Sequence, residues 1–278
     1  MIELDLLYLA DRFKPKEIVK EIFDQNPQLS GRVPLEEIAE AVGIREIRYH
    51  SLDGIEGALL ANPEKTKGIV VIDDGSRYHR QRFTLGHELG HFLIPKHGHE
   101  MSCASADLNA NIHKGINSEK RIEAEANQFS AELLMPIHLF TTTPQFRSEP
   151  SIVAIDQISR YFDVSFQTCA NRYIDLQTDP VAVVFSHYGN VKYSKRGKGI
   201  PFWLKVNKGD SVPSQSFTKK VDAKCSELNC SDECDSSVWF EEAKDFELPE
   251  FVIEDVLVQD KGYMVTLLWF NCVILDKE

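Results

Sequence analysis

Residues 82–93 read Arg82-Phe83-Thr84-Leu85-Gly86-His87-Glu88-Leu89-Gly90-His91-Phe92-Leu93. We expect a helix over residues 77–94, ended by Pro95. Residues four apart lie on one face of a helix, so His87 and His91 can both reach a single Zn²⁺. Glu88 lies beside the first histidine and reaches a water on the metal rather than the metal. This position makes it the candidate general base of a zinc peptidase.

A short HExxH pattern recurs by chance, and histidine and glutamate on a helix surface would produce it too. The flanks of this motif are apolar from Phe83 to Phe92, which favours a buried site. Gly86 and Gly90 weaken a helix. They could instead let another part of the backbone approach the site closely.

A second helix, predicted over residues 119–134, offers the third ligand. Glu123 lies next to the apolar stripe of that helix, and Asn127 follows one turn later. Two histidines and Glu123 leave a fourth position for water, as a catalytic zinc site requires. Asn127 could hold the other ring nitrogen of a ligand histidine. The competing carboxylates are expected on a more exposed side of the helix: Glu119, Glu125 and Glu132.

Together these helices resemble the ImmA/IrrE family of metallopeptidases. The second stretch reads Glu123-Ala124-Glu125-Ala126-Asn127-Gln128-Phe129-Ser130-Ala131-Glu132-Leu133-Leu134-Met135-Pro136, and the resemblance covers roughly residues 15–176. It implies a gluzincin-like fold, zinc ligands at His87, His91 and Glu123, and a catalytic glutamate at Glu88. Members of this family cleave helix-turn-helix repressors, often encoded beside them, and so derepress phage, mobile-element or stress genes.

The predicted fold class is α+β, in two domains. Residues 1–178 are expected to form the zincin-like metallopeptidase domain, with helices and a small sheet. Residues 179–278 are expected to form a β-rich domain for substrate or signal recognition. The polar segment 95–118 is predicted to be a loop. The predicted strands are Ile44–His50, Glu56–Ala61, Gly68–Asp73, Val181–Ser186, Val191–Tyr193, Ser237–Phe240, Phe251–Gln259 and Tyr263–Phe270.

Composition limits the partners and the compartment. The net charge of −12 argues against direct nucleic-acid binding, which usually needs a positive surface. No apolar run is long enough for a membrane-spanning helix, and the first residues are acidic where a signal peptide is basic. We therefore expect a cytoplasmic protein, without a membrane partner, whose six cysteines are reduced.

Two further groups of side chains could take part in chemistry. Cys225, Cys230 and Cys234 could hold a structural zinc, with Cys272 or His187 as a fourth ligand, although free thiols are the simpler expectation. One of three loop histidines could stabilise an oxyanion, but each is expected at the surface: His97, His99 and His113.

The leading hypothesis is a zinc endopeptidase that cleaves a helix-turn-helix repressor. Mn²⁺ or another divalent ion could replace zinc at two histidines and a glutamate. Two alternatives stay open. One is a zinc-bearing module that binds or senses a partner without cutting it. The other is a toxin or phage-defence effector whose C-terminal region recognises a trigger.

Overall fold

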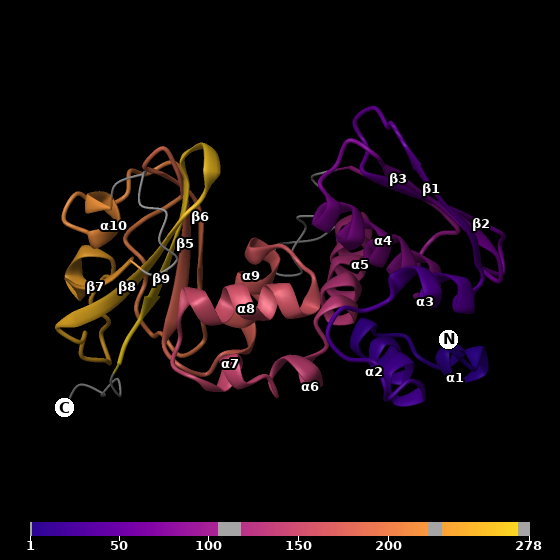
Figure 1. The fold of residues 1–278 in the computed structure, drawn as a ribbon, viewed down its shortest axis with the longest axis horizontal. Coiled ribbons are helices and arrows are strands. Elements are labelled where there is room, and N and C mark those ends of the chain that lie inside the picture. The colour runs from indigo at the N-terminus through magenta and orange to yellow at the C-terminus, as the bar shows by residue number, and fades with distance from the viewer. Residues whose placement is uncertain (1, 105–117, 222–229, 272–278) are drawn as a thin grey trace. The chain divides into compact units, whose positions relative to one another are not determined.

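The computed structural model describes residues 2–104, 118–221 and 230–271 (Figure 1). The chain packs as two compact units. The first unit contains Met1–Phe140 and Arg160–Ser165, and the second contains Thr141–Ser159 and Phe166–Glu278. Within the described ranges, no helix has both the length and the apolar character needed to cross a membrane.

A four-stranded sheet forms one layer of the first unit, in the order β1-β3-β2-β4. The pair β1–β3 is parallel, and β2 pairs antiparallel with both β3 and β4. Alternate residues of β3 are buried, so one face of the sheet carries the core. The strands are β1 (Ile44–His50), β2 (Gly57–Ala61), β3 (Gly68–Asp73) and β4 (Glu100–Cys103).

Helices cover the buried face of this sheet (Figure 1). The helix α3 packs on β1, α4 packs on β2 and β3, and α5 packs on α4. The close contact between α4 and α5 uses the two glycines of the motif helix. A Cβ atom added at Gly86 would lie 2.6 Å from Ser130 Oγ, and one added at Gly90 would lie 3.2 Å from Ala126 Cα. The unit's helices are α1 (Leu6–Ala10), α2 (Pro15–Gln25), α3 (Leu35–Val42), α4 (Tyr78–Leu93), α5 (Ser118–Leu134) and α6 (Ile137–Phe140).

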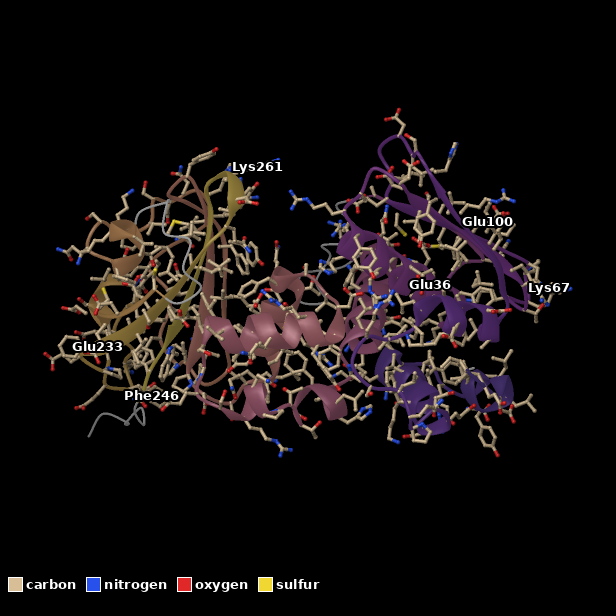
Figure 2. All side chains as sticks on the ribbon, viewed as in Figure 1. Glu36, Lys67, Glu100, Glu233, Phe246 and Lys261 are labelled. Atoms are coloured by element: carbon tan, nitrogen blue, oxygen red, sulfur yellow. The ribbon has the colours of Figure 1, made fainter. Side chains whose placement is uncertain are left out.

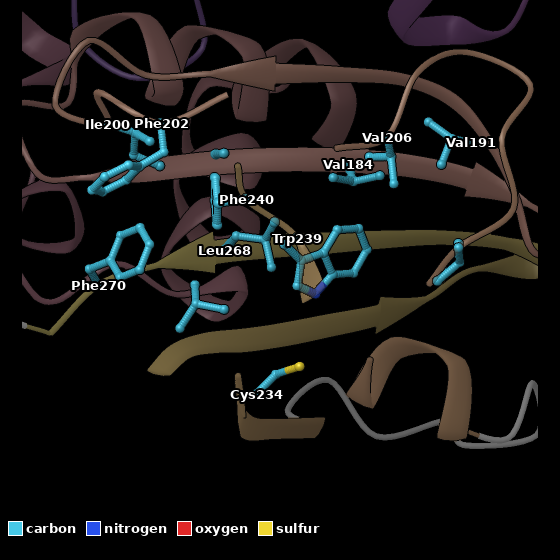
Figure 3. Close-up of a cluster of buried hydrophobic side chains, with 13 residues drawn as sticks. Val184, Val191, Ile200, Phe202, Val206, Cys234, Trp239, Phe240, Leu268 and Phe270 are labelled. Atoms are coloured by element: carbon cyan, nitrogen blue, oxygen red, sulfur yellow. The ribbon is translucent and has the colours of Figure 1, made fainter. Parts of the chain in front are cut away.

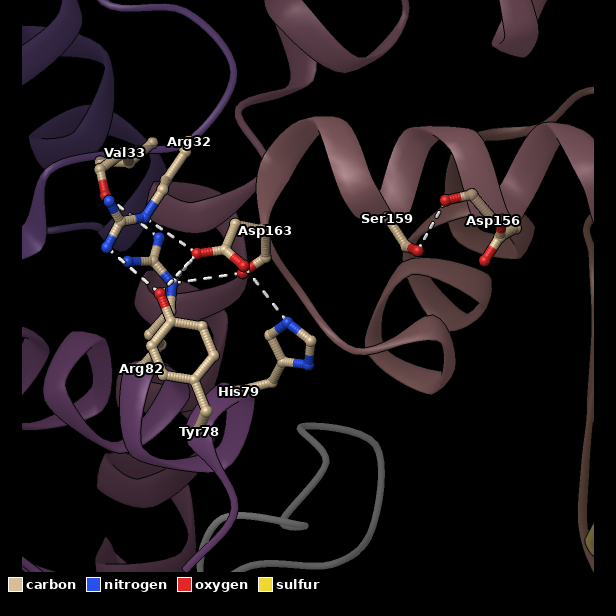
Figure 4. A network of polar contacts seen from close by, with 8 residues as sticks. All are labelled: Arg32, Val33, Tyr78, His79, Arg82, Asp156, Ser159 and Asp163. Carbon is tan, nitrogen blue, oxygen red and sulfur yellow. Dashed lines mark hydrogen bonds and ion pairs between the residues drawn. The ribbon is translucent and has the colours of Figure 1, made fainter. Parts of the chain in front are cut away.

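Asp163 joins the first half of α4 to a distant part of the same unit (Figure 4). Its carboxylate accepts hydrogen bonds from Arg32 Nε at 2.9 Å and from the Tyr78 hydroxyl at 2.6 Å. The buried Arg82 lies 3.5 Å from the same carboxylate and donates to the Asp163 and Val33 carbonyl oxygens. These contacts fix the helix that carries the histidine motif.

Replacing Asp163 by asparagine should lower the free energy of unfolding by about 1–3 kcal/mol at neutral pH, because Arg82 loses its charged partner. Asparagine tolerates the left-handed backbone at this position (φ 53°). Burial alone would raise the pKa of Asp163, but the Tyr78 hydrogen bond and the Arg82 charge outweigh it and lower the pKa. The stability that the Asp163 carboxylate contributes is therefore fully present above the pKa that Asp163 has in the unfolded chain. It is lost as the pH falls through the lower pKa that Asp163 has in the folded protein.

Urea denaturation at pH 7 and near pH 3 measures this effect. The difference between wild type and Asp163→Asn should be large at pH 7 and shrink at pH 3. The exposed pair of Glu46 and Arg48 provides the control, and Glu46→Gln should leave unfolding nearly unchanged. Equal stability of the Asp163 variant and wild type at pH 7 would contradict this role.

The second unit is built on a five-stranded antiparallel sheet, in the order β6-β5-β9-β8-β7. Thirteen buried side chains pack into one core, among them Trp239, Phe240 and Phe270 (Figure 3). The strands are β5 (Val181–His187), β6 (Asn190–Arg196), β7 (Cys230–Asp235), β8 (Phe251–Val258) and β9 (Tyr263–Trp269). The helical elements are α7 (Pro144–Arg147), α8 (Ile152–Phe162), α9 (Phe166–Leu176), α10 (Phe217–Lys220), η2 (Ser236–Val238) and η3 (Asp260–Gly262).

The α+β class and the β-rich C-terminal part are confirmed, but two local predictions are wrong. The predicted loop 95–118 contains β4, a short edge strand that exists through its pairing with β2. The predicted strand Ser237–Phe240 begins instead with the turn η2, which the side chain of Asp235 caps by accepting from Ser237 N. The strand β4 depends on its pairing with β2, whereas η2 follows from the local cap at Asp235.

The packing division also differs from the predicted boundary at residue 178. Asp255 of β8 accepts a hydrogen bond of 2.7 Å from Ile152 N at the start of α8, and α9 packs against β5 and β6. Most of both helices therefore packs with the C-terminal sheet. As a boundary between functions, residue 178 stays a prediction.

Candidate metal centre

The structure brings His87 and His91 of α4 together with Glu123 of α5. The Nε2 atoms of the two histidines lie 2.9 Å apart, and Glu123 Oε2 lies 3.1 Å and 3.5 Å from them. Nitrogen ligands at tetrahedral zinc are separated by about 3.3 Å. Both imidazoles are fully buried, and the Glu123 side chain is 12% exposed. The three side chains predicted as ligands therefore have the separations that one metal ion requires.

A fourth donor, Cys103 Sγ, completes this cluster. It lies 3.2 Å from His87 Nε2 and 3.6 Å from His91 Nε2. Among the described residues, these four side chains form the group of histidine, cysteine and acidic donors that could hold a metal, with donor atoms within 4.8 Å of one another. Cys103 was not among the predicted ligands, because it lies in the segment predicted to be a loop.

The sheet explains why Cys103 faces the metal site. It lies opposite Gly57 in the β2–β4 ladder, so both residues point to the same face. A Cβ atom added at Gly57 would lie 2.4 Å from Thr84 Cγ2 and 2.8 Å from Glu88 Oε1. Glycine is thus required at this point of β2, because Glu88 and Thr84 of α4 occupy the space of a side chain.

Glu88 is completely buried beside the cluster. Neither of its carboxylate oxygens meets hydrogen-bond geometry with another described group. Burial raises the pKa of Glu88 to about 7, while the nearby His87 and the Cys103 thiol lower it and the Glu123 charge raises it. A buried carboxylate at this position can accept a proton from a water or a substrate. Such a pKa also suits proton transfer near neutral pH.

Both histidines of the cluster have a contact at their other ring nitrogen. Asn127 Oδ1 lies 2.9 Å from His87 Nδ1, the contact that the sequence suggested. His97 Nδ1 lies 3.0 Å from His91 Nδ1, and Glu125 Oε2 lies 3.3 Å from His97 Nε2. Such contacts orient metal-binding histidines and fix their tautomers. His97 is buried, so the expectation of a surface histidine was wrong, whereas His99 is exposed.

The charge states of these groups suit metal binding. Burial lowers the pKa of His91, and burial together with the charge of His91 lowers the pKa of His97 to about 4. Burial would raise the pKa of Glu123, but the hydrogen bonds with His87 and His91 outweigh it and lower the pKa to about 2. Neutral imidazole and ionised carboxylate are the forms that bind metal.

Lys65 fixes the C-terminal end of α4. It lies in the turn between β2 and β3, and its Nζ donates to the carbonyl oxygens of His91 at 2.8 Å, Ile94 at 2.6 Å and His97 at 3.2 Å. A cation here complements the negative end of the helix dipole. Burial lowers the pKa of Lys65 to about 8. No sequence motif links this lysine to the site, since the contact depends on the turn.

The competing candidates divide into three groups. Glu132 is buried and accepts a hydrogen bond from Ile137 N, so the exposed position expected for it was wrong. Cys230 and Cys234 lie on β7, but they belong to no described group of three possible metal ligands. The remaining candidates lie outside the part of the chain whose side chains are described: Glu119, His113, Cys225 and Cys272.

One family model matches the part of the chain that contains this site. A family model described as the IrrE N-terminal-like domain matches residues 39–173. That range includes every donor of the cluster and Glu88. Residues 39–173 are a domain of the ImmA/IrrE metallopeptidase family. The family implies a divalent metal, which the donor set of this domain fits.

Two curated relatives and one solved structure resemble the chain. The Radiation response metalloprotease IrrE of Deinococcus radiodurans is 27% identical over 51% of this chain and 39% of its own length. The protein of the same name from Deinococcus deserti is 30% identical over 42% of this chain and 41% of its own. The chain thus spans about two fifths of these relatives. A structure described as a Mycobacterium tuberculosis transcriptional regulator shares the fold, with a TM-score of 0.56 and 16% identity over 92% of this chain and 76% of its own.

Proposed function

We propose that this chain is a zinc-dependent endopeptidase that cleaves a helix-turn-helix transcriptional repressor. The observation that carries the proposal is the position of Glu88, fully buried next to His87, His91 and Glu123. The bound metal would polarise the scissile carbonyl and lower the pKa of water. Glu88 would take the proton of the attacking water and deliver it to the leaving amine.

The edge strand β4 offers a position where an extended substrate could bind. β4 is the last strand in the order β1-β3-β2-β4, and its final residue, Cys103, contacts the ligand histidines. Extended peptides commonly bind by adding a strand to a sheet edge. A substrate segment along β4 would bring its peptide bonds past the metal ligands. Glu100 at the start of this strand is exposed (Figure 2).

The repressor as substrate rests on the family resemblance, and the stress role rests on the relatives' names, which mention radiation response. A second candidate has an observation in its favour. The fourth donor, Cys103, could close the coordination sphere, as in a metal-bearing module that binds a partner without cutting it.

The test is incubation of the purified chain with the helix-turn-helix protein encoded beside its gene. Zn²⁺ or Mn²⁺ is supplied, or a chelator is added, and mass spectrometry follows the products. We expect two fragments from one peptide bond with metal and none with chelator. An intact repressor under all conditions, bound or unbound, would reject this substrate and favour the non-cleaving module.

A further inference from the structure

Cys103 adds a fourth possible ligand to the three expected of a zinc peptidase site. A nitrogen and a sulfur ligand on one tetrahedral zinc lie about 3.5 Å apart. Cys103 Sγ lies 3.2 Å and 3.6 Å from the ligand nitrogens of His87 and His91. We propose that the Cys103 thiolate is a fourth ligand of the metal, which keeps the peptidase latent until another group replaces it. The latency rests on the function proposed above, whereas the ligand role does not.

Charge in the buried site favours the thiolate. Two neutral histidines and ionised Glu123 around a divalent cation leave one positive charge. The Cys103 thiolate brings the net charge of the metal and its four ligands to zero. Both histidines and Cys103 are fully buried, and an uncompensated charge in such a place is costly. A metal also deprotonates a coordinating thiol.

The closed surroundings favour a resting state without room for substrate. His87, Glu88, His91 and Cys103 are all inaccessible to solvent, and Glu123 is the donor with residual exposure. Hydrolysis needs an open metal position, which structural four-ligand sites lack. Glu88 already lies next to this position, completely buried. Removal of one ligand would therefore convert a closed site into a hydrolytic one.

The strand that carries Cys103 is short and lies at the edge of the sheet. β4 has four residues, ends the sheet and pairs with β2. Short edge strands belong to the parts of a protein that open most easily. Cys103 is the last residue of β4, so a shift of the strand end would withdraw the thiol while the other three ligands, on α4 and α5, stay in place.

The ligand role is tested on the protein loaded with Co²⁺ alone. Wild type should show a near-ultraviolet thiolate-to-cobalt charge-transfer band, and Cys103→Ser and Cys103→Ala should lack it while still binding one Co²⁺. X-ray absorption of the zinc form should show a sulfur at about 2.3 Å in wild type only. Cys230→Ser, at a partly exposed cysteine of β7, is the control and should keep the band. A band that persists without Cys103, or is absent from wild type, would overturn the proposal.

Latency is tested by cleavage of the neighbouring repressor. If the closed form outweighs the open form tenfold or more, Cys103→Ala should cleave at least about tenfold faster than wild type. Equal or slower cleavage by the variant, with the sulfur ligand confirmed, would overturn latency. If neither protein cleaves the repressor but the sulfur ligand is present, the proposed latent peptidase is rejected. The result then supports a module that binds a metal through four ligands.

Discussion

Replacing Glu88 by glutamine should lower the rate of repressor cleavage by about 10²- to 10⁴-fold, because glutamine cannot accept the proton of the attacking water. The two side chains have nearly the same shape, which matters where Gly57 and Thr84 enclose the carboxylate. The Cys103 thiol, which acts on the Glu88 carboxylate, can equally donate to the amide oxygen of glutamine. The variant should therefore keep its metal and its fold.

The measurement is kcat/KM for repressor cleavage, with metal content determined on the same sample. Since wild type could be latent, the comparison is repeated in the Cys103→Ala background, where loss of the proton acceptor should be equally severe. Glu46→Gln, at an exposed carboxylate of β1, is the control and should cleave like its parent. If Glu88→Gln cleaved as fast as its parent, Glu88 would not be the general base, and the proposed mechanism would be rejected.

Local sequence signals were sufficient where spacing along one helix determines the geometry. His87 and His91 meet because they are four residues apart on α4. Glu123 and Asn127 are likewise one turn apart on α5, and the structure places one against each side of His87. The two motif glycines indicated the close approach of α5, which brings these residues to α4.

Local sequence patterns did not predict the residues whose contacts depend on pairing between strands or on a turn. Cys103 reaches the site because β4 pairs with β2 opposite Gly57. Polar and apolar residues alternate over Glu100–Cys103, but a run of four residues inside a polar segment is too short to distinguish a strand from a loop. His97 is buried by its contacts with His91 and Glu125, although its segment reads as a polar loop. Lys65 reaches the end of α4 from a turn nearly thirty residues earlier. Tertiary contacts decide these positions.

Replacing Glu123 by alanine should abolish stoichiometric zinc binding. The free energy of binding a buried zinc is about 10–16 kcal/mol, and loss of the carboxylate that α5 contributes should raise the dissociation constant by more than about 10²-fold. The change also removes the carboxylate between the two histidines, 3.1 Å and 3.5 Å from their Nε2 atoms. Competition with a chelating dye, together with metal analysis after dialysis, gives the constant.

The matched control is the neighbouring carboxylate on the same helix. Glu125 contacts His97 rather than the cluster, so Glu125→Gln, which can still accept a hydrogen bond, should change the dissociation constant by less than about tenfold. Loss of zinc from Glu125→Gln but not from Glu123→Ala would move the third ligand to Glu125. In that case His97, which already lies between Glu125 and His91, would be the histidine to examine next. Loss from both variants would mean that the contacts from Glu125 through His97 to His91 contribute as much to the metal affinity as Glu123 does.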